Sequence, residues 1–168
     1  MKKPEPVQVI KERRDTALTR LVGGIAFVRF LGIRFDRKGD ELTAVLPYDP
    51  KLIGNPMLPA LHGGATAGFL EVAAVVQLAW QELWSQIEGR AVDPQRLAAE
   101  GQPRLPKTID FSVDYLRAGL PRDAYARARV NRSGRRYASV HVEAWQDNVH
   151  RPFAQATGHF LMPQQKTD

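Results

Sequence analysis

Residues 61–83 read LHGGATAGFLEVAAVVQLAWQEL, and this stretch decides the fold. Between His62 and Glu82 the only ionisable side chain is Glu71, and most other residues are Ala, Val, Leu, Gly or Trp. A helix that is apolar on nearly every face is buried, so we expect a buried helix that carries a buried carboxylate. Such a carboxylate either finds partners or has its pKa raised, which makes a useful general base or nucleophile.

The composition fits one globular domain in a reducing compartment. The chain has 168 residues, 43% of them apolar, which is enough for one substantial core. It has no cysteine, which excludes disulfides, thiolate metal sites and cysteine nucleophiles. The start, MKKPEPVQVIKERRD, lacks the apolar run of a signal peptide, so we expect a cytoplasmic protein. The 61–83 stretch could cross a bilayer by length, but its glycines, glutamines and Glu71 favour a soluble buried helix.

The charge suggests an anionic partner. The net charge is +6 and the isoelectric point is about 9.9, which suits nucleic acid or a phosphorylated small molecule. One basic cluster lies at the amino end and the other, RARVNRSGRRY, spans residues 127–137. Charge alone does not choose between the two classes of partner.

The first half of the chain is predicted to contain two helices with a pair of strands between them. The apolar spacing predicts an amphipathic helix over 7–22, ended by Gly23 and Gly24, and leaves an apolar patch at 25–31 unassigned. The pattern then predicts, in chain order, strands at 32–37 and 41–47, a proline-rich loop at 49–60, the long helix from His62 to Glu88, and a connector at 89–107 with a short helix at 93–101.

The second half alternates with a period of two, which predicts strands. They are expected at 108–115, 124–130, 138–145 and 151–161, with turns at Ser133-Gly134 and Asp147-Asn148. A long apolar helix and several strands can bury their apolar faces only against each other, so we expect an α+β fold with a largely antiparallel sheet. Alanines at 124, 126, 128, 138 and 144 would let the helix lie close to the sheet.

The start of the long helix is a candidate oxyanion site. Unpaired N–H groups and the positive end of the helix dipole meet at His62-Gly63-Gly64, and glycine lets a ligand approach closely. Gly63 and Glu71 would lie about 12 Å apart along one helix, too far for one acyl carbon to contact both. Catalysis by this pair therefore requires a neighbouring subunit to supply one of the two groups.

Three segments together resemble the hotdog-fold acyl-CoA thioesterases of the phenylacetate type, which carry an HGG motif. They are HGGATAGFLEVAA, TIDFSVDYLRAG and RRYASVHVEAWQDNVHRPFAQATGHFLMP, and the resemblance spans about residues 30–162. It implies a hotdog fold, in which an antiparallel sheet wraps a long central helix, as a homodimer or homotetramer. The domains would be a helical extension at 1–30, the hotdog domain at 31–163 and a tail at 164–168.

The resemblance also implies the site residues. Glu71 stands where the family has an acid that activates water or attacks the thioester, and the amides of Gly63 and Gly64 would hold the thioester oxygen. Asn55 is the candidate for a loop Asn that binds water or substrate, although it precedes His62 by seven residues where the family pattern has six. Val75 occupies a position where a Ser or Thr is common.

The basic turn of the 127–137 cluster is the candidate coenzyme A contact. Related proteins hold coenzyme A phosphates here, and arginines with glycine amides suit phosphate. The turn consists of Arg132, Ser133, Gly134, Arg135 and Arg136. Coenzyme A enters as part of the substrate, and no separate cofactor or metal is expected.

Each assignment has a simpler alternative. Glu71 could be a solvated helix residue, the arginine turn a soluble hairpin tip, and His62 a helix-start residue bonded to backbone, which we favour over a general base. His141, His150 and His159 lack metal-ligand spacing. No GxSxG, P-loop or GxGxxG motif occurs.

The sequence therefore predicts hydrolysis of acyl-CoA thioesters in a pocket lined by Leu58, Leu61, Phe69 and the 108–115 strand. The alternatives are an acyl-CoA-binding hotdog module without catalysis and a hotdog hydratase or dehydratase. No membrane or nucleic-acid partner is expected, because the nucleic-acid hypothesis rests on charge alone. The acyl chain length stays open.

Overall fold

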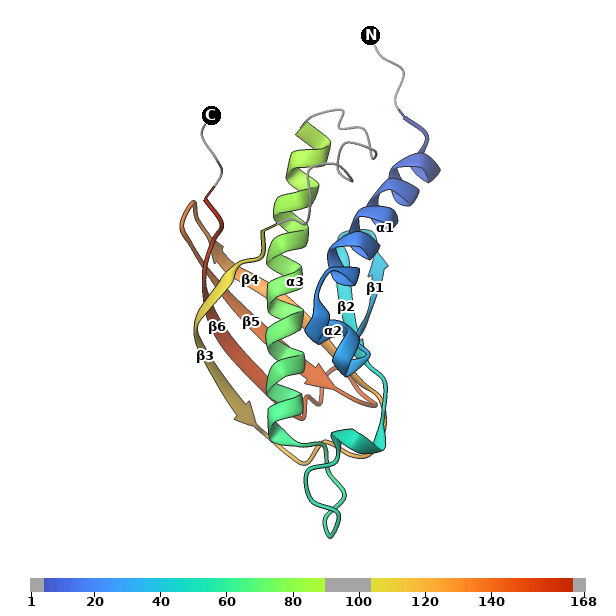
Figure 1. The fold of residues 1–168 in the computed structure, drawn as a ribbon, viewed down its shortest axis with the longest axis vertical. Coiled ribbons are helices and arrows are strands. Elements are labelled where there is room, and N and C mark those ends of the chain that lie inside the picture. Colours follow the sequence, from blue (N-terminus) through green and yellow to red (C-terminus); the bar gives the residue numbers. More distant parts are fainter. Residues whose placement is uncertain (1–4, 90–103, 165–168) are drawn as a thin grey trace.

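A long helix lies in the hollow of a curved antiparallel sheet in the computed structural model, which describes residues 5–89 and 104–164 (Figure 1). The helix, α3, spans Gly63–Gly89. The six-stranded sheet has the order β1-β2-β4-β5-β6-β3. Its strands are β1 Arg34–Lys38, β2 Glu41–Leu46, β3 Lys107–Tyr115, β4 Ala124–Ser133, β5 Tyr137–Trp145 and β6 Ala154–Leu161. The predicted helix wrapped by an antiparallel sheet is confirmed.

Small side chains on the inner sheet face bring α3 close. Ala124, Ala126, Ala138 and Ala144 are fully buried, as their alternation predicted, and Ala128 is half-buried. Against them lie large residues of α3, including Phe69 and Leu70, which are also fully buried. Close packing over this face removes most of the apolar surface of α3 from water, and this burial is the main stabilising contribution of the fold.

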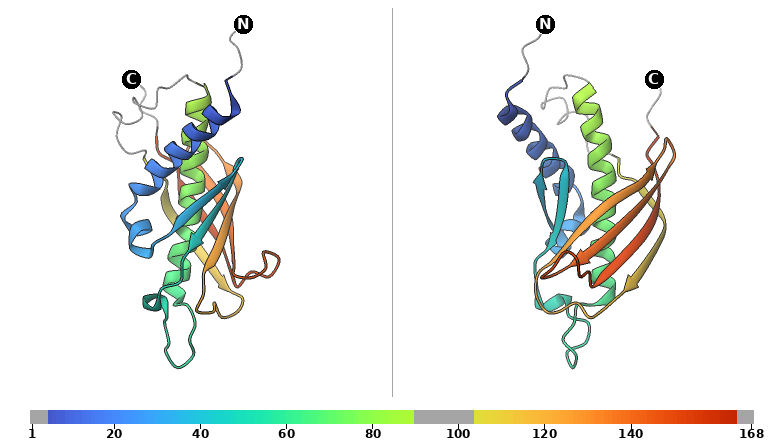
Figure 2. Two further views of the ribbon diagram at one scale, coloured as in Figure 1. Left: turned by 90° about the vertical axis from the view of Figure 1, so that its right-hand side faces the viewer. Right: turned by 180° about the vertical axis from the view of Figure 1, so that it is seen from behind.

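Two helices precede the sheet and flank α3. The first, α1, spans Val7–Gly23, as the amphipathic pattern predicted. The second, α2, spans Ala26–Leu31 in the patch that the sequence left unassigned, and it ends at Gly32 with a left-handed φ of 71°. Figure 2 shows both helices on the β1–β2 side of α3, away from β3.

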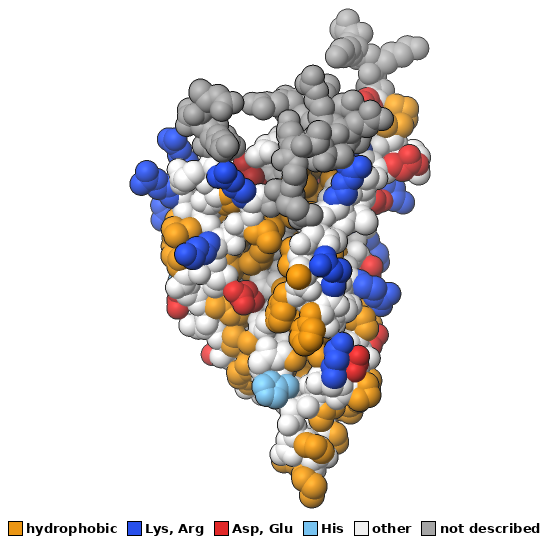
Figure 3. Space-filling view, in the orientation of Figure 1, with side chains coloured by type: hydrophobic (Ala, Val, Ile, Leu, Met, Phe, Trp, Pro, Cys, Tyr) orange, Lys and Arg blue, Asp and Glu red, His pale blue; other side chains and the backbone are white. Residues whose placement is uncertain are grey.

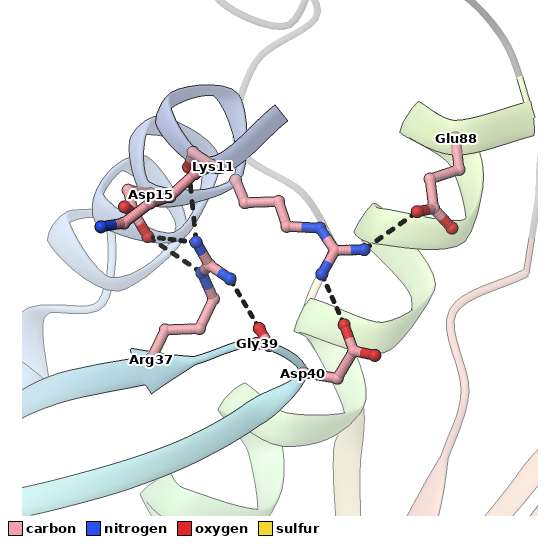
Figure 4. A network of polar contacts seen from close by, with 7 residues as sticks. Lys11, Asp15, Arg37, Gly39, Asp40 and Glu88 are labelled. Carbon is pink, nitrogen blue, oxygen red and sulfur yellow. Dashed lines mark hydrogen bonds and ion pairs between the residues drawn. The ribbon is translucent and has the colours of Figure 1, made fainter. Parts of the chain in front are cut away.

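Two arginines attach α1 to the rest of the protein (Figure 4). The Arg14 guanidinium bonds to Asp40 at 2.5 Å and Glu88 at 2.9 Å, and it stacks 4.0 Å from the centroid of the Trp84 ring. Arg37 pairs with Asp15 at 2.7 Å. These contacts connect α1 to the β1–β2 turn and to the last turns of α3.

The start of the last strand differs from the prediction. The last strand begins at Ala154 rather than 151, because Asn148 forms a turn that accepts hydrogen bonds from His150 and Arg151. The short helix predicted at 93–101 lies outside the described residues.

Helix α3 is long and apolar enough to cross a membrane, but 61% of its most apolar window is buried inside the protein, as in a core helix.

Candidate active site

The start of α3 is capped by His62. Its own amide donates to Leu52 O at 2.7 Å, and its ring Nδ1 accepts the Gly64 amide at 2.9 Å. The ring therefore performs the task of an N-cap side chain, which accepts one of the amides that a helix start leaves unpaired. In this structure His62 has the backbone-bonded role, and the Gly64 amide is already engaged.

Gly63 is the first residue of α3, and its amide is free. Among the residues that the structure describes, none accepts a hydrogen bond from this amide. Its carbonyl accepts the Tyr115 hydroxyl at 2.8 Å, and a Cβ placed on Gly63 would lie 3.3 Å from that oxygen. Glycine thus lets the end of β3 lie directly against the helix start, while the Gly63 amide keeps its capacity to donate.

Glu71 is half-buried rather than buried, which corrects the expectation from the sequence. Thr108 donates a 2.6 Å hydrogen bond to Oε1 of Glu71, a contact that the sequence did not predict. Within residues 5–89 and 104–164, no other group bonds to this carboxylate. The carboxylate is thus fixed through one oxygen, while the other oxygen has no hydrogen-bond partner among the described residues and can take a ligand or water.

The exposure of Glu71 follows from a stripe of α3 that the sheet does not cover. Gly64, Gly68, Glu71 and Val75 are spaced at three and four residues, so they share one face of the helix. Each is exposed or half-buried, whereas most of α3 is buried. This uncovered stripe lies between β3 and α2, on the side of α3 that the sheet leaves open (Figure 1).

An irregularity in β3 directly follows Thr108, the residue that bonds to Glu71. The pairing of β3 with β6 shifts between Thr108 and Asp110, which is a β-bulge that leaves Ile109 without a partner. The predicted alternation is therefore wrong at Ile109, which is 49% exposed, while Phe111 and Val113 face inward and are half-buried. A bulge re-aims the side chains on either side of it, and here it accompanies the one threonine that reaches the acid.

Asn55 lies in an exposed loop that precedes α3 and protrudes from the base of the molecule (Figure 1). Its side-chain oxygen accepts the Met57 amide at 2.9 Å, which is a local turn bond. Asn55 precedes the start of α3 in the chain, and none of its hydrogen bonds among the described residues reaches Glu71 of the same chain.

The three residues predicted to line the pocket lie in different surroundings within one subunit. Leu58 stands at the tip of the protruding loop and is 71% exposed, so it lines no pocket within one subunit. Phe69 points from α3 into the core and is fully buried. Leu61 is buried beside the helix start.

The basic turn lies level with Thr108 across the sheet. Cross-strand pairs place Ser133, Ala138, Phe160 and Thr108 in one row. Three strand spacings separate Thr108 from Ser133, which is about 14 Å. Residues 132–136 are all exposed, and Gly134 closes the turn through its bond to Tyr137 O.

Known proteins are similar to this chain in sequence. The model of a family described as acyl-CoA thioesterase N-terminal domain matches residues 54–161. The medium/long-chain acyl-CoA thioesterase YigI of Escherichia coli is 34% identical over 123 residues, which cover 70% of this chain and 73% of YigI.

Solved structures share the fold. A Shewanella oneidensis protein related to the thioesterase superfamily is 25% identical with a TM-score of 0.70, over 95% of this chain and 100% of that one. The PaaI protein of the Escherichia coli phenylacetic acid degradation operon has a TM-score of 0.67 at 14% identity, over 90% of this chain and 94% of that one. The fold is therefore the hotdog fold.

Proposed function

The chain belongs to the acyl-CoA thioesterase family, and from this premise we propose that it hydrolyses acyl-CoA thioesters at a site shared by two subunits. Water adds to the thioester carbonyl, the carbon–sulfur bond breaks, and a free acid and the thiol of coenzyme A leave. The observation that carries this proposal is the lone carboxylate of Glu71, held by Thr108 on the uncovered stripe of α3.

Glu71 is the proposed base or nucleophile. As a base, its free oxygen takes a proton from the attacking water; as a nucleophile, the same oxygen forms an anhydride that water then cleaves. Thr108 supports either role, because a β-branched side chain has few rotamers and holds the carboxylate in one orientation. The half-buried position leaves Glu71 accessible to substrate.

Gly63 is the proposed donor to the thioester oxygen. Its free amide lies at the positive end of α3, where negative charge that develops on an oxygen is stabilised. The Gly64 amide can donate to the same oxygen only if that oxygen displaces the His62 ring, because Nδ1 of His62 accepts this amide at 2.9 Å. His62 is thereby a positioning residue that caps the helix start.

A second copy of the chain completes the site. Eight residues of one helix separate Gly63 from Glu71, about 12 Å, so one acyl group contacts both only if they come from different subunits. The sheet offers a place for the second copy, because β3 is an edge strand with exposed Ile109 and Tyr115. A long edge strand with apolar side chains is a template for pairing with another chain. We therefore place the two-fold contact along β3.

The remaining site residues bind the rest of the substrate in this proposal. The turn from Arg132 to Arg136 contacts the phosphates of coenzyme A through its guanidinium and amide groups. Asn55 contributes to the site of the partner subunit in this proposal. Its loop lies before the start of α3, and that start is more than two helical turns away from Glu71 of the same chain. The name of the relative YigI supports medium or long acyl chains as substrates.

Thiol release from acyl-CoA tests the proposal. Glu71→Gln should remove most turnover while the circular dichroism spectrum stays unchanged, and Glu82→Gln on the same helix should keep turnover. Unchanged turnover in Glu71→Gln would refute the role of this acid. If the wild type binds acyl-CoA tightly in calorimetry yet releases no thiol over hours, the chain is the non-catalytic binding module instead.

A further inference from the structure

Two exposed aromatic side chains of α2 stand beside the uncovered stripe. Phe27 is 45% exposed and Phe30 is 64% exposed, and their rings stack with centroids 6.1 Å apart. A pair of large exposed apolar side chains beside a candidate site marks a surface that contacts something apolar. Neither residue belongs to the 54–161 segment that the family model matches.

The ring of Phe27 lies directly on the stripe. A Cβ placed on Gly68 would lie 2.9 Å from Cε1 of Phe27, so the ring touches the helix at a position that only glycine leaves open. Gly68 precedes Glu71 by three residues, which is slightly less than one turn, or about 4.5 Å along the axis. Phe27 therefore forms a wall of the stripe within one helical turn of the proposed acid.

The two ends of the stripe differ in polarity. Near Thr108 the exposed residues include the basic Arg104 and Lys107 just before it in the chain and the 132–136 turn across the sheet, together with the apolar Leu105 and Ile109. Toward the helix start several large apolar residues are exposed, namely Phe27, Phe30, Met57 and Leu58, with the Lys51 ammonium 5.6 Å from the centroid of the Phe30 ring. Figure 3 shows hydrophobic side chains over the centre and lower part of this face, with Lys and Arg side chains at its upper left and along its right side.

This polarity matches the two ends of an acyl-CoA molecule. Its phosphates suit the basic end and its hydrocarbon chain suits the apolar end, because charge is solvated or paired while hydrocarbon leaves water. With the thioester at Glu71, the acyl chain then runs toward α2 and meets the Phe27 ring. Opposite placement would put phosphate groups against phenyl rings and hydrocarbon against arginines.

We propose that Phe27 sets the acyl-chain length that the enzyme accepts, an inference that rests on the proposed function. The ring closes the path of the chain one turn beyond Glu71, so its size decides how many methylenes fit. Each methylene that a hydrophobic site gains or loses changes kcat/KM by about 10-fold or more. Chain-length specificity would thus come from α2, a helix outside the matched family segment.

The test compares kcat/KM for octanoyl-CoA and dodecanoyl-CoA in four proteins. Phe27→Ala should raise the dodecanoyl-to-octanoyl ratio about tenfold over the wild type, and Phe27→Trp should lower it by a similar factor. Phe30→Ala is the matched control, because Gly68 has Phe27 and Leu31 as its neighbours and not Phe30. A ratio unchanged in both Phe27 variants, or shifted equally in Phe30→Ala, would overturn the inference.

A binding measurement separates this inference from the proposed function. In the Glu71→Gln background, calorimetry with the same two acyl-CoAs reports chain-length dependence without turnover. Phe27→Ala should shift the ratio of the two dissociation constants toward dodecanoyl-CoA there as well. A wild type without turnover but with this shift would sink the hydrolysis proposal alone, and normal turnover without the shift would sink only the role of Phe27.

Discussion

Thr108 and Glu71, separated by 37 residues in the chain, are joined by a 2.6 Å hydrogen bond from the threonine hydroxyl to the carboxylate. Thr108 stands beside a bulge in the edge strand β3, and Glu71 stands on the one face of α3 that the sheet leaves open. The bond therefore fixes the orientation of the proposed catalytic group from an element that lies at the proposed subunit contact.

Removing the Thr108 hydroxyl should slow the reaction without weakening substrate binding. Thr108→Val keeps the shape but frees the carboxylate to rotate, so we expect kcat to fall between about 10- and 100-fold with KM little changed. Thr108→Ser retains the donor and should restore most of kcat. Steady-state kinetics below the unfolding temperature check this, and a Val variant with wild-type kcat would contradict it.

Removing the Gly63 amide should lower kcat more than removing the Thr108 hydroxyl does. Proline is well tolerated at the first position of a helix but has no N–H, so Gly63→Pro deletes the proposed donor in place. We expect kcat to fall by about 10²–10³, as when one oxyanion donor is lost. Gly63→Ala is the control, because it adds a Cβ near Tyr115 yet keeps the amide. Equal kcat in the two variants would argue against the donor role.

A charge on the open edge of β3 should separate the subunits. Ile109 is the exposed bulge residue of this strand, so Ile109→Lys should shift the sedimentation profile from dimer toward monomer and lower turnover with it. Val149→Lys places the same charge in an exposed turn elsewhere and should change neither. A fully dimeric and active Ile109→Lys protein would place the contact away from β3.

Arg14 should contribute to stability and not to chemistry. Its guanidinium packs on Trp84 and pairs with Asp40 and Glu88, both of which are exposed, so each ion pair alone is weak. Loss of the stacking and the pairs together in Arg14→Ala should cost about 1–2 kcal/mol of unfolding free energy, measured by urea denaturation. Lys11→Ala, on the same helix, should change stability by less than about 0.5 kcal/mol.

Local patterns predicted most of the fold. The apolar run of α3 and the alternation of β4 and β5 are properties of consecutive residues, so the sequence reveals them directly. Helix α2 was missed because its six residues make fewer than two turns, too few for a helical period to appear.

The site was predicted only in part, because some of its features are local in the sequence and others depend on how distant elements pack. Glu71 and Gly63 stand out as a lone acid and a glycine at a helix start. The Thr108 contact depends on how β3 lies against α3, which no local pattern gives. The bulge beside Thr108 appears only in the pairing of β3 with β6, because the residues themselves keep alternating with a period of two. The half-exposure of Glu71 was missed because no sequence pattern tells which face of an apolar helix stays uncovered. The His62–Gly64 bond spans two residues, so the place of His62 at the helix start was enough for the sequence to favour its backbone-bonded role, which the structure confirms.

Subunit complementation tests the shared site most directly. Glu71→Gln and Gly63→Pro each remove one proposed half of the chemistry, and random pairing of the two co-expressed chains gives mixed dimers in which one site has both halves intact. The account predicts that the mixture regains about a quarter of wild-type thiol release, although each variant alone is nearly inactive. Activity no greater than that of the separate variants, in a mixture shown to contain mixed dimers, would contradict it.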